Sequence, residues 1–104
     1  MPAHQPDSLS TADGLAVVRR IAERTENIID TMHSQARGRQ RTITRRQMEL
    51  CCQRGTVTEG PFVNSHGNWQ MNLRRHAAGE EITCVVAIEW DTKILIVTAF
   101  HGGG

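Results

Sequence analysis

The stretch TMHSQARGRQRTITRRQMELCCQRG, residues 31–55, concentrates positive charge and marks the ends of its own helices. Between Arg37 and Arg54 it holds six arginines and a single acid, Glu49. The whole chain of 104 residues has a formal net charge of only +1, so acidic residues elsewhere must offset this segment. The stretch therefore predicts a local basic surface on a molecule that is close to neutral.

The second half of this stretch carries the clearest helix signals in the chain. Thr44 and Gln47 have the spacing of a capping box, in which each side chain accepts a hydrogen bond from the backbone N–H of the other residue. Gly55 stands where a helix usually closes in the left-handed conformation. The expected apolar face repeats at spacings of three and four and consists of Met48, Cys51 and Cys52. We expect a helix between Thr44 and Gly55, and a shorter helix before it at residues 33–40.

The segments before this stretch have weaker signals. The first ten residues are polar and include two prolines, which favours disorder. Ser10 or Thr11 can cap the next helix, and residues 27–32 predict a short strand. The expected division of the chain is a disordered tail at 1–10, an N-terminal helix at 11–26, an α+β domain at 27–101 and a flexible tail at 102–104.

After Gly55 the apolar residues change from a helical period to a period of two, which predicts an antiparallel meander. Residues 56–63 form the first expected strand, and their Gly60-Pro61 pair suits an edge or a bulge. In the second strand the apolar side chains alternate with polar ones, at Trp69, Met71 and Leu73. Turns are expected at residues 64–68 and 77–80.

The last two expected strands, residues 82–90 and 94–100, are nearly continuous apolar runs. Such runs are typical of central strands that are covered on both faces, or on one face and at a partner contact. The helices must cover one side of this sheet. The chain therefore predicts an α+β fold in which N-terminal helices pack on one face of a four-stranded antiparallel sheet.

Composition limits the class of protein. The chain is long enough for one domain with a single core. Eleven of its twelve basic residues are arginines, which favours flat contacts to phosphate or carboxylate, although arginine-rich codon usage has the same result. The chain has no signal-peptide pattern, no membrane-span run and no disulfide framework, so we expect a cytoplasmic setting, with export by a dedicated machine as the alternative.

A series of short motifs occurs in a fixed order along residues 27–101. They are HSxxR at 33–37, RTITRRQMEL at 41–50, RGTV at 54–57, GNW at 67–69, VVAI at 85–88 and IVT at 96–98. As an ordered set, these motifs resemble the domain-of-unknown-function family numbered 4258. The chain departs from the family pattern at Ser34, Gly38 and Arg41-Thr42 and keeps it at His33 and Arg37.

The resemblance implies a fold and an activity. The family is grouped with the RelE/ParE-like toxins and, more widely, with the barnase–EndoU–colicin–RelE ribonuclease fold. The resemblance therefore implies helices on a four-stranded antiparallel sheet, in agreement with the periodicities above. It also implies cleavage of RNA without a metal or any other cofactor.

Metal-independent RNA cleavage needs a base for the 2′-hydroxyl proton, a cation for the charge that develops around phosphorus, and an acid for the leaving oxygen. His33 and Arg37 are four residues apart and share a face of the expected helix, so they can serve as base and phosphate clamp. In related folds a residue on the sheet completes the site, which points to Thr98. His76 is the first choice for the acid. His101 ranks below it, because alternation puts His101 on the strand face opposite Thr98.

The arginines expected to contact RNA phosphates lie on the basic helices and near a strand end. They are Arg39, Arg41, Arg45, Arg46, Arg74 and Arg75. Structural roles are the alternative for the site residues. His33 and Arg37 can cap or hydrogen-bond within the helix pair, and residues 74–76 can form a solvated hairpin tip. His66 falls in a turn and is expected to be exposed and without a role.

No metal site is expected, because the cysteines and histidines lack the spacings that zinc sites use. Cys51 and Cys84 fit the role of small core residues. The first functional interpretation is a RelE-like toxin or toxin-derived protein that acts on RNA and has a cognate antitoxin. The alternative is a non-catalytic phage or mobile-element protein that binds a host protein or nucleic acid. A third interpretation is an accessory domain that dimerises through its apolar strands.

Overall fold

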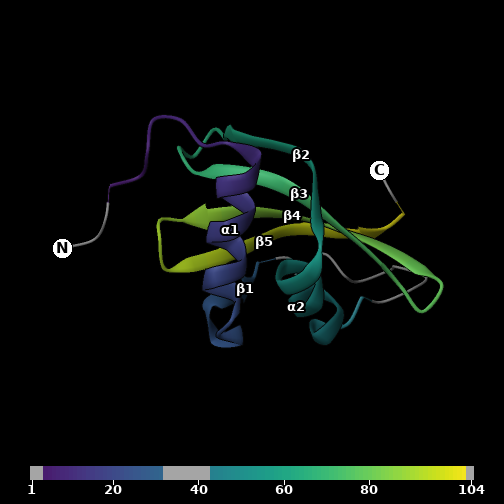
Figure 1. Cartoon of the computed structure of the whole chain (residues 1–104). Helices are drawn as coiled ribbons and strands as arrows, with labels where there is room; N and C mark the ends of the chain where they lie inside the picture. Colours follow the sequence, from purple (N-terminus) through teal and green to yellow (C-terminus); the bar gives the residue numbers. More distant parts are fainter. Residues whose placement is uncertain (1–3, 32–42, 103–104) are drawn as a thin grey trace.

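The structure is a computed structural model that describes residues 4–31 and 43–102. Within these ranges, no helix combines the length and the apolar character that crossing a bilayer requires. Figure 1 shows two helices lying against a twisted sheet. The elements in chain order are α1 Thr11–Ala22, a 3-10 turn Thr25–Asn27, β1 Ile28–Asp30, α2 Arg45–Arg54, β2 Thr56–Val63, β3 Trp69–Ala77, β4 Glu80–Glu89 and β5 Lys93–His101.

The sheet confirms the α+β class and corrects the predicted strand number. Its strands lie in the order β1-β5-β4-β3-β2, and every neighbouring pair is antiparallel except β1 and β5. The meander formed by β2 to β5 agrees with the sequence. The expected four-stranded antiparallel sheet is wrong because β1 adds a fifth, parallel strand, with Ile28 opposite Ile94. This pairing buries Ile28, and nothing local in a three-residue segment indicates which strand it joins.

Both helices cover the same face of the sheet, and the core lies between them and the strands (Figure 1). Each strand contributes alternate residues to this layer. The largest fully buried side chains of the sheet are Ile28, Met71, Leu73, Ile88, Ile94 and Ile96. The opposite face has no described helix, and its exposed large apolar side chains are Ile29, Phe62 and Val97.

The N-terminal segment is anchored to the end of the β2–β3 hairpin. The Ser10 side chain caps α1 by accepting a hydrogen bond from the Asp13 backbone N–H at 3.1 Å. Before it, residues 4–9 have no regular secondary structure. Even so, the Trp69 indole Nε1 donates to the Pro6 carbonyl at 3.0 Å, and Leu9 packs against the core. These contacts extend the core layer beyond the start of α1.

The capping box that begins α2 agrees with the sequence. Thr44 and Gln47 exchange both hydrogen bonds, at 2.8 and 3.1 Å. At the other end, the predicted left-handed closure is wrong, because Gly55 is extended at φ −72° and ψ 171°. A Cβ on Gly55 would lie 2.4 Å from the Cys51 carbonyl oxygen and 3.1 Å from that of Arg74. Glycine is therefore required here for space, since the chain runs straight from α2 into β2.

The predicted edge strand with an irregularity at Gly60-Pro61 is confirmed. β2 is the last strand of the sheet, and its register with β3 shifts twice between Val57 and Phe62. A third register shift lies between β4 and β5, where Val85 pairs with Thr98 and Val86 pairs with Ile96. Val97 is the extra residue at this bulge.

Gly55→Ala is expected to lower the free energy of unfolding by about 2–3 kcal/mol, because the new methyl group overlaps backbone atoms of two elements. Gly67→Ala is the control. Gly67 has a φ of +84°, but a Cβ there would meet no atom within 4 Å, so about 1 kcal/mol of backbone strain is expected. Urea unfolding measures both values, and equal losses would contradict the close approach at Gly55.

Candidate functional site

The residues proposed from sequence fall into three groups in the structure. His33, Arg37, Arg39 and Arg41 lie outside the described residues. Thr98, His76 and Arg74 belong to the sheet face that carries no described helix. Arg45 and Arg46 lie on α2, and Arg75 lies on β3, on the sheet face that the helices cover.

Thr98 and His76 share a face but are not brought together. On β4, the partner of Thr98 is Val85 and the partner of His76 is Glu81. These partners are four residues apart, which separates the two rows by roughly 13 Å along the strands. β4 also lies between the two strands that carry Thr98 and His76. His76 is exposed beside the β3–β4 turn and has no contact with Thr98 in this arrangement.

Arg45 and Arg46 are adjacent on α2 but have different surroundings. The Arg45 Nη2 donates to the backbone carbonyls of Thr25 and Ile28, at 2.8 and 2.6 Å, and its Nε donates to Glu49 at 3.1 Å. Its guanidinium therefore ties α2 to the segment that leads into β1. Arg46 contacts only Glu49 among the described residues, and its side chain is 64% exposed. Of the two, Arg46 is the one available for a phosphate.

Arg74 and Arg75 point to opposite faces of β3, because side chains alternate along a strand. Arg74 is exposed on the helix-free face. Arg75 is half-buried on the helix side, where it forms part of the wall of an open cavity of about 120 Å³. The cavity lies between the first turn of α2 and the β3–β4 hairpin, and its lining consists of Gln47, Arg75, Ala77, Ala78, Glu80 and Ile82.

The Glu80 carboxylate is the most connected group at this cavity. Its Oε2 accepts a hydrogen bond from the Gln47 amide nitrogen at 3.4 Å, and its Oε1 lies 3.3 Å from His101 Nε2. The same Gln47 side chain closes the capping box through its oxygen. The carboxylate is thus held from α2 on one side and from β5 on the other.

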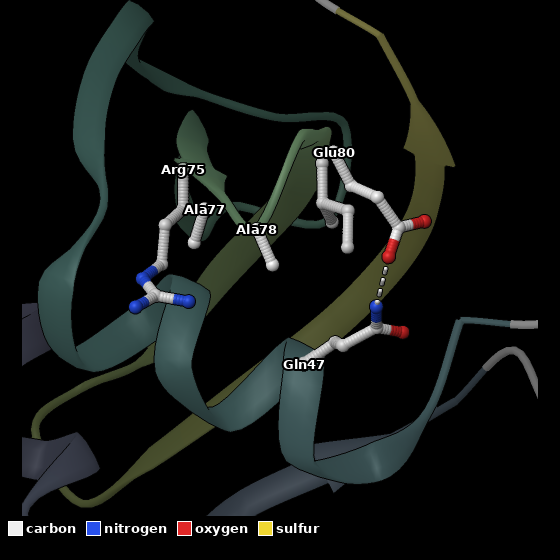
Figure 2. A pocket seen from close by; sticks show the side chains of 6 residues that line it. Gln47, Arg75, Ala77, Ala78 and Glu80 are labelled. Atoms are coloured by element: carbon white, nitrogen blue, oxygen red, sulfur yellow. Dashed lines mark hydrogen bonds between the residues drawn. The ribbon is translucent and has the colours of Figure 1, made fainter.

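Arg75 and Glu80 lie on opposite sides of the cavity, with Ala77 and Ala78 between them (Figure 2). Among the described residues, none forms a hydrogen bond or an ion pair with the Arg75 guanidinium. The His101 side chain is 26% exposed, so solvent reaches the imidazole. The cavity therefore has, on one side of a small apolar floor, a guanidinium that no described residue pairs with, and on the other side a carboxylate that contacts His101.

Gln47 and Glu80 are not among the site residues predicted from sequence, and the sequence ranks His101 below His76. The prediction that His101 and Thr98 lie on opposite faces of β5 is confirmed. Their partners on β4 are Ile82 and Val85, which are three residues apart and therefore face opposite sides. The signal for the cavity was the strand alternation itself. Arg75 and Ala77 have the same parity as buried Leu73, and a two-residue turn would place Glu80 and Ile82 beside them.

Three buried thiols lie in the core layer between α2 and the sheet. Cys51 and Cys52 belong to α2, and Cys84 belongs to β4. A hydrogen bond from Cys84 and the nearby Arg75 charge lower the pKa of Cys51, against the effect of burial. The pKa of Cys84 is raised by the same hydrogen bond and by burial, and burial raises the pKa of Cys52 to about 12. Within the described ranges, no three histidine, cysteine or acidic side chains are placed to hold a metal ion.

No family model, curated protein or solved structure matches this chain. The geometry of the cavity is therefore the basis for a proposed function.

Arg45→Ala is expected to lower the free energy of unfolding by about 1–3 kcal/mol, because two backbone carbonyls lose a charged donor. Arg46→Ala is the matched control. Its exposed ion pair contributes little, and a change within about 0.5 kcal/mol is expected. Chemical denaturation of both variants checks this difference, and a larger loss in Arg46→Ala would show that the structural role is assigned to the wrong arginine.

Proposed function

We propose that the protein is a RelE-like toxin or toxin-derived protein that cleaves RNA without a metal ion, at the cavity between α2 and the β3–β4 hairpin. The observation that carries this proposal is the contact of His101 with Glu80, the carboxylate that lies on the side of the cavity opposite Arg75. A histidine, a carboxylate that orients it and an unpaired guanidinium are the groups that acid–base cleavage of a phosphodiester requires. The resemblance of the sequence to RelE-like proteins supports the same chemistry.

His101 is the proposed proton-transfer residue. Its Nε2 faces the Glu80 carboxylate, so the neutral imidazole keeps its proton on Nε2 and presents the Nδ1 lone pair to a substrate. Nδ1 can then accept the proton of a 2′-hydroxyl group. The positive charge that forms on the ring is stabilised by Glu80, which Gln47 holds through the other carboxylate oxygen.

Arg75 is the proposed phosphate ligand. A guanidinium makes two parallel hydrogen bonds to phosphate oxygens, and its charge is unpaired among the described residues. Exposed Arg46, on the same helix as Gln47, extends the positive surface along the substrate backbone. His33 and Arg37, the base and clamp proposed from sequence, stay predictions for the same reaction.

Cleavage of bacterial RNA by the purified chain in EDTA is the direct test. His101→Ala and Arg75→Ala are each expected to lower the cleavage rate by about 100-fold or more, the usual effect of losing a general base or an electrostatic ligand. The control His66→Ala replaces an exposed turn histidine and is expected to keep the wild-type rate. His33→Ala and Arg37→Ala in the same assay test the site proposed from sequence. Full activity in His101→Ala would exclude the cavity as the site.

A second candidate function is binding of a host protein without catalysis. The helix-free face of the sheet favours it, since Ile29, Phe62 and Val97 are each between 39% and 43% exposed there. β5 itself lies between β1 and β4, so Ile94–Ile96 offer no free edge for pairing with a second copy. A partner would therefore pack on the face of the sheet.

If the chain proves inactive on RNA, Val97→Glu is expected to reduce retention of a bacterial partner protein in affinity capture by about tenfold or more, because it buries a charge in the contact. Val63→Glu is the matched control. Val63 is 49% exposed but pairs with Trp69, which faces the helices, so this variant should capture the partner as the wild type does. Equal capture by all three proteins would exclude this face as the contact surface.

A further inference from the structure

Besides the cavity, the contact between α2 and the sheet contains a pair of thiols, those of Cys51 and Cys84. Cys51 is the residue one turn after Gln47 on α2, and Cys84 is on β4, two residues after Ile82. Both side chains are completely buried. They therefore lie in the core layer directly behind two walls of the cavity.

The hydrogen bonds of Cys51 place its sulfur atom against the β3–β4 ladder, at the row of residues that contains Cys84. The Cys51 Sγ donates to the Leu73 carbonyl at 3.3 Å and lies 3.7 Å from the Ile82 carbonyl. Leu73 is the direct partner of Cys84 in the β3–β4 ladder. A hydrogen bond between the two side chains lowers the pKa of Cys51 and raises that of Cys84. A cysteine of the helix and a cysteine of the strand thus lie beside each other in the core.

We infer that Cys51 and Cys84 form a redox-active dithiol, which a peroxide oxidises to an intramolecular disulfide that joins α2 to β4. The inference is independent of the proposed RNA cleavage, since it uses neither His101 nor Arg75 as a reactant. Cys52 takes no part, although it is adjacent to Cys51 in the sequence.

The reaction balances with hydrogen peroxide as the oxidant. The Cys51 thiolate attacks one peroxide oxygen, the O–O bond breaks and a sulfenic acid forms, while the hydroxide that leaves takes up the proton released by Cys51 and becomes one water. The Cys84 sulfur then attacks the Cys51 sulfur, the S–O bond breaks, and the hydroxide that leaves takes the Cys84 proton and becomes a second water. Both thiols are oxidised and the peroxide is reduced to two waters.

The surroundings of the three thiols select this pair. The hydrogen bond from Cys84 and the positive charge of Arg75 lower the pKa of Cys51, which favours the thiolate as the attacking group. Burial raises the pKa of Cys52 to about 12, so that thiol stays protonated at neutral pH. Because all three are buried, the oxidant reaches them during local opening of α2 from the sheet.

The test uses the full chain, reduced, folded and then treated with hydrogen peroxide. Remaining thiols are alkylated with N-ethylmaleimide after unfolding. The expected product is a monomer that has lost two hydrogen atoms, carries one alkyl group and returns to the reduced mass with dithiothreitol. In the peptide map without reductant, the peptide that contains Cys84 should be linked to the one that contains Cys51.

Cys51 and Cys52 are adjacent, so the variants decide which of them is linked. Cys52→Ala is expected to form the bond as the wild type does, whereas Cys51→Ala and Cys84→Ala should lose it completely. Circular dichroism checks that each variant is folded; if Cys84→Ala unfolds, the wild-type peptide map and Cys52→Ala still decide. A Cys51–Cys52 bond, a link between chains, or oxidation beyond the sulfenic acid without a link would each overturn the inference.

Discussion

The close approach of α2 to β3 and β4 is the constraint on which the rest of the structure depends. Cys51 and Gly55 are one turn apart at the end of the helix, and both are small. The Cys51 thiol reaches the Leu73 carbonyl, and Gly55 lies where any Cβ would overlap backbone. A larger residue at either position would move the helix outward. Because protein cores are packed as densely as organic crystals, this movement would open gaps along the whole helix face.

The close packing of α2 on the sheet also positions the polar groups of the cavity. Gln47 is one turn before Cys51, so it shares the face that points to the sheet. Its oxygen completes the capping box with Thr44, and its nitrogen reaches Glu80. One hydrogen bond of this kind contributes only about 0.5–1.5 kcal/mol to stability. Its larger effect is on orientation, since it occupies one carboxylate oxygen and leaves the other facing His101.

The parts of the fold that the sequence predicted are those with local signals. The capping box of α2 needs only Thr44 and Gln47, and the edge position of β2 follows from Gly60-Pro61, whose proline has no N–H to donate. The parallel pairing of β1 and the extended conformation of Gly55 depend on residues far along the chain. The cavity belongs to this second kind, since Gln47 and Glu80 are 33 residues apart. No local pattern could associate them.

The turn between β3 and β4 explains why the lining of the cavity could not be predicted from sequence. Ala78 and Gly79 both have positive φ, at 54° and 75°, as in the two-residue hairpin turns that fit the twist of a sheet. This turn pairs Ala77 with Glu80 and therefore sets which residues of β4 lie beside Arg75 on the helix side. The dipeptide Ala-Gly is not one of the usual signals for it, so the turn length was open. A shift of one residue would exchange the two faces of a strand. Glu80 and Ile82 would then leave the face that carries Arg75, so the lining of the cavity depends on the length of one turn.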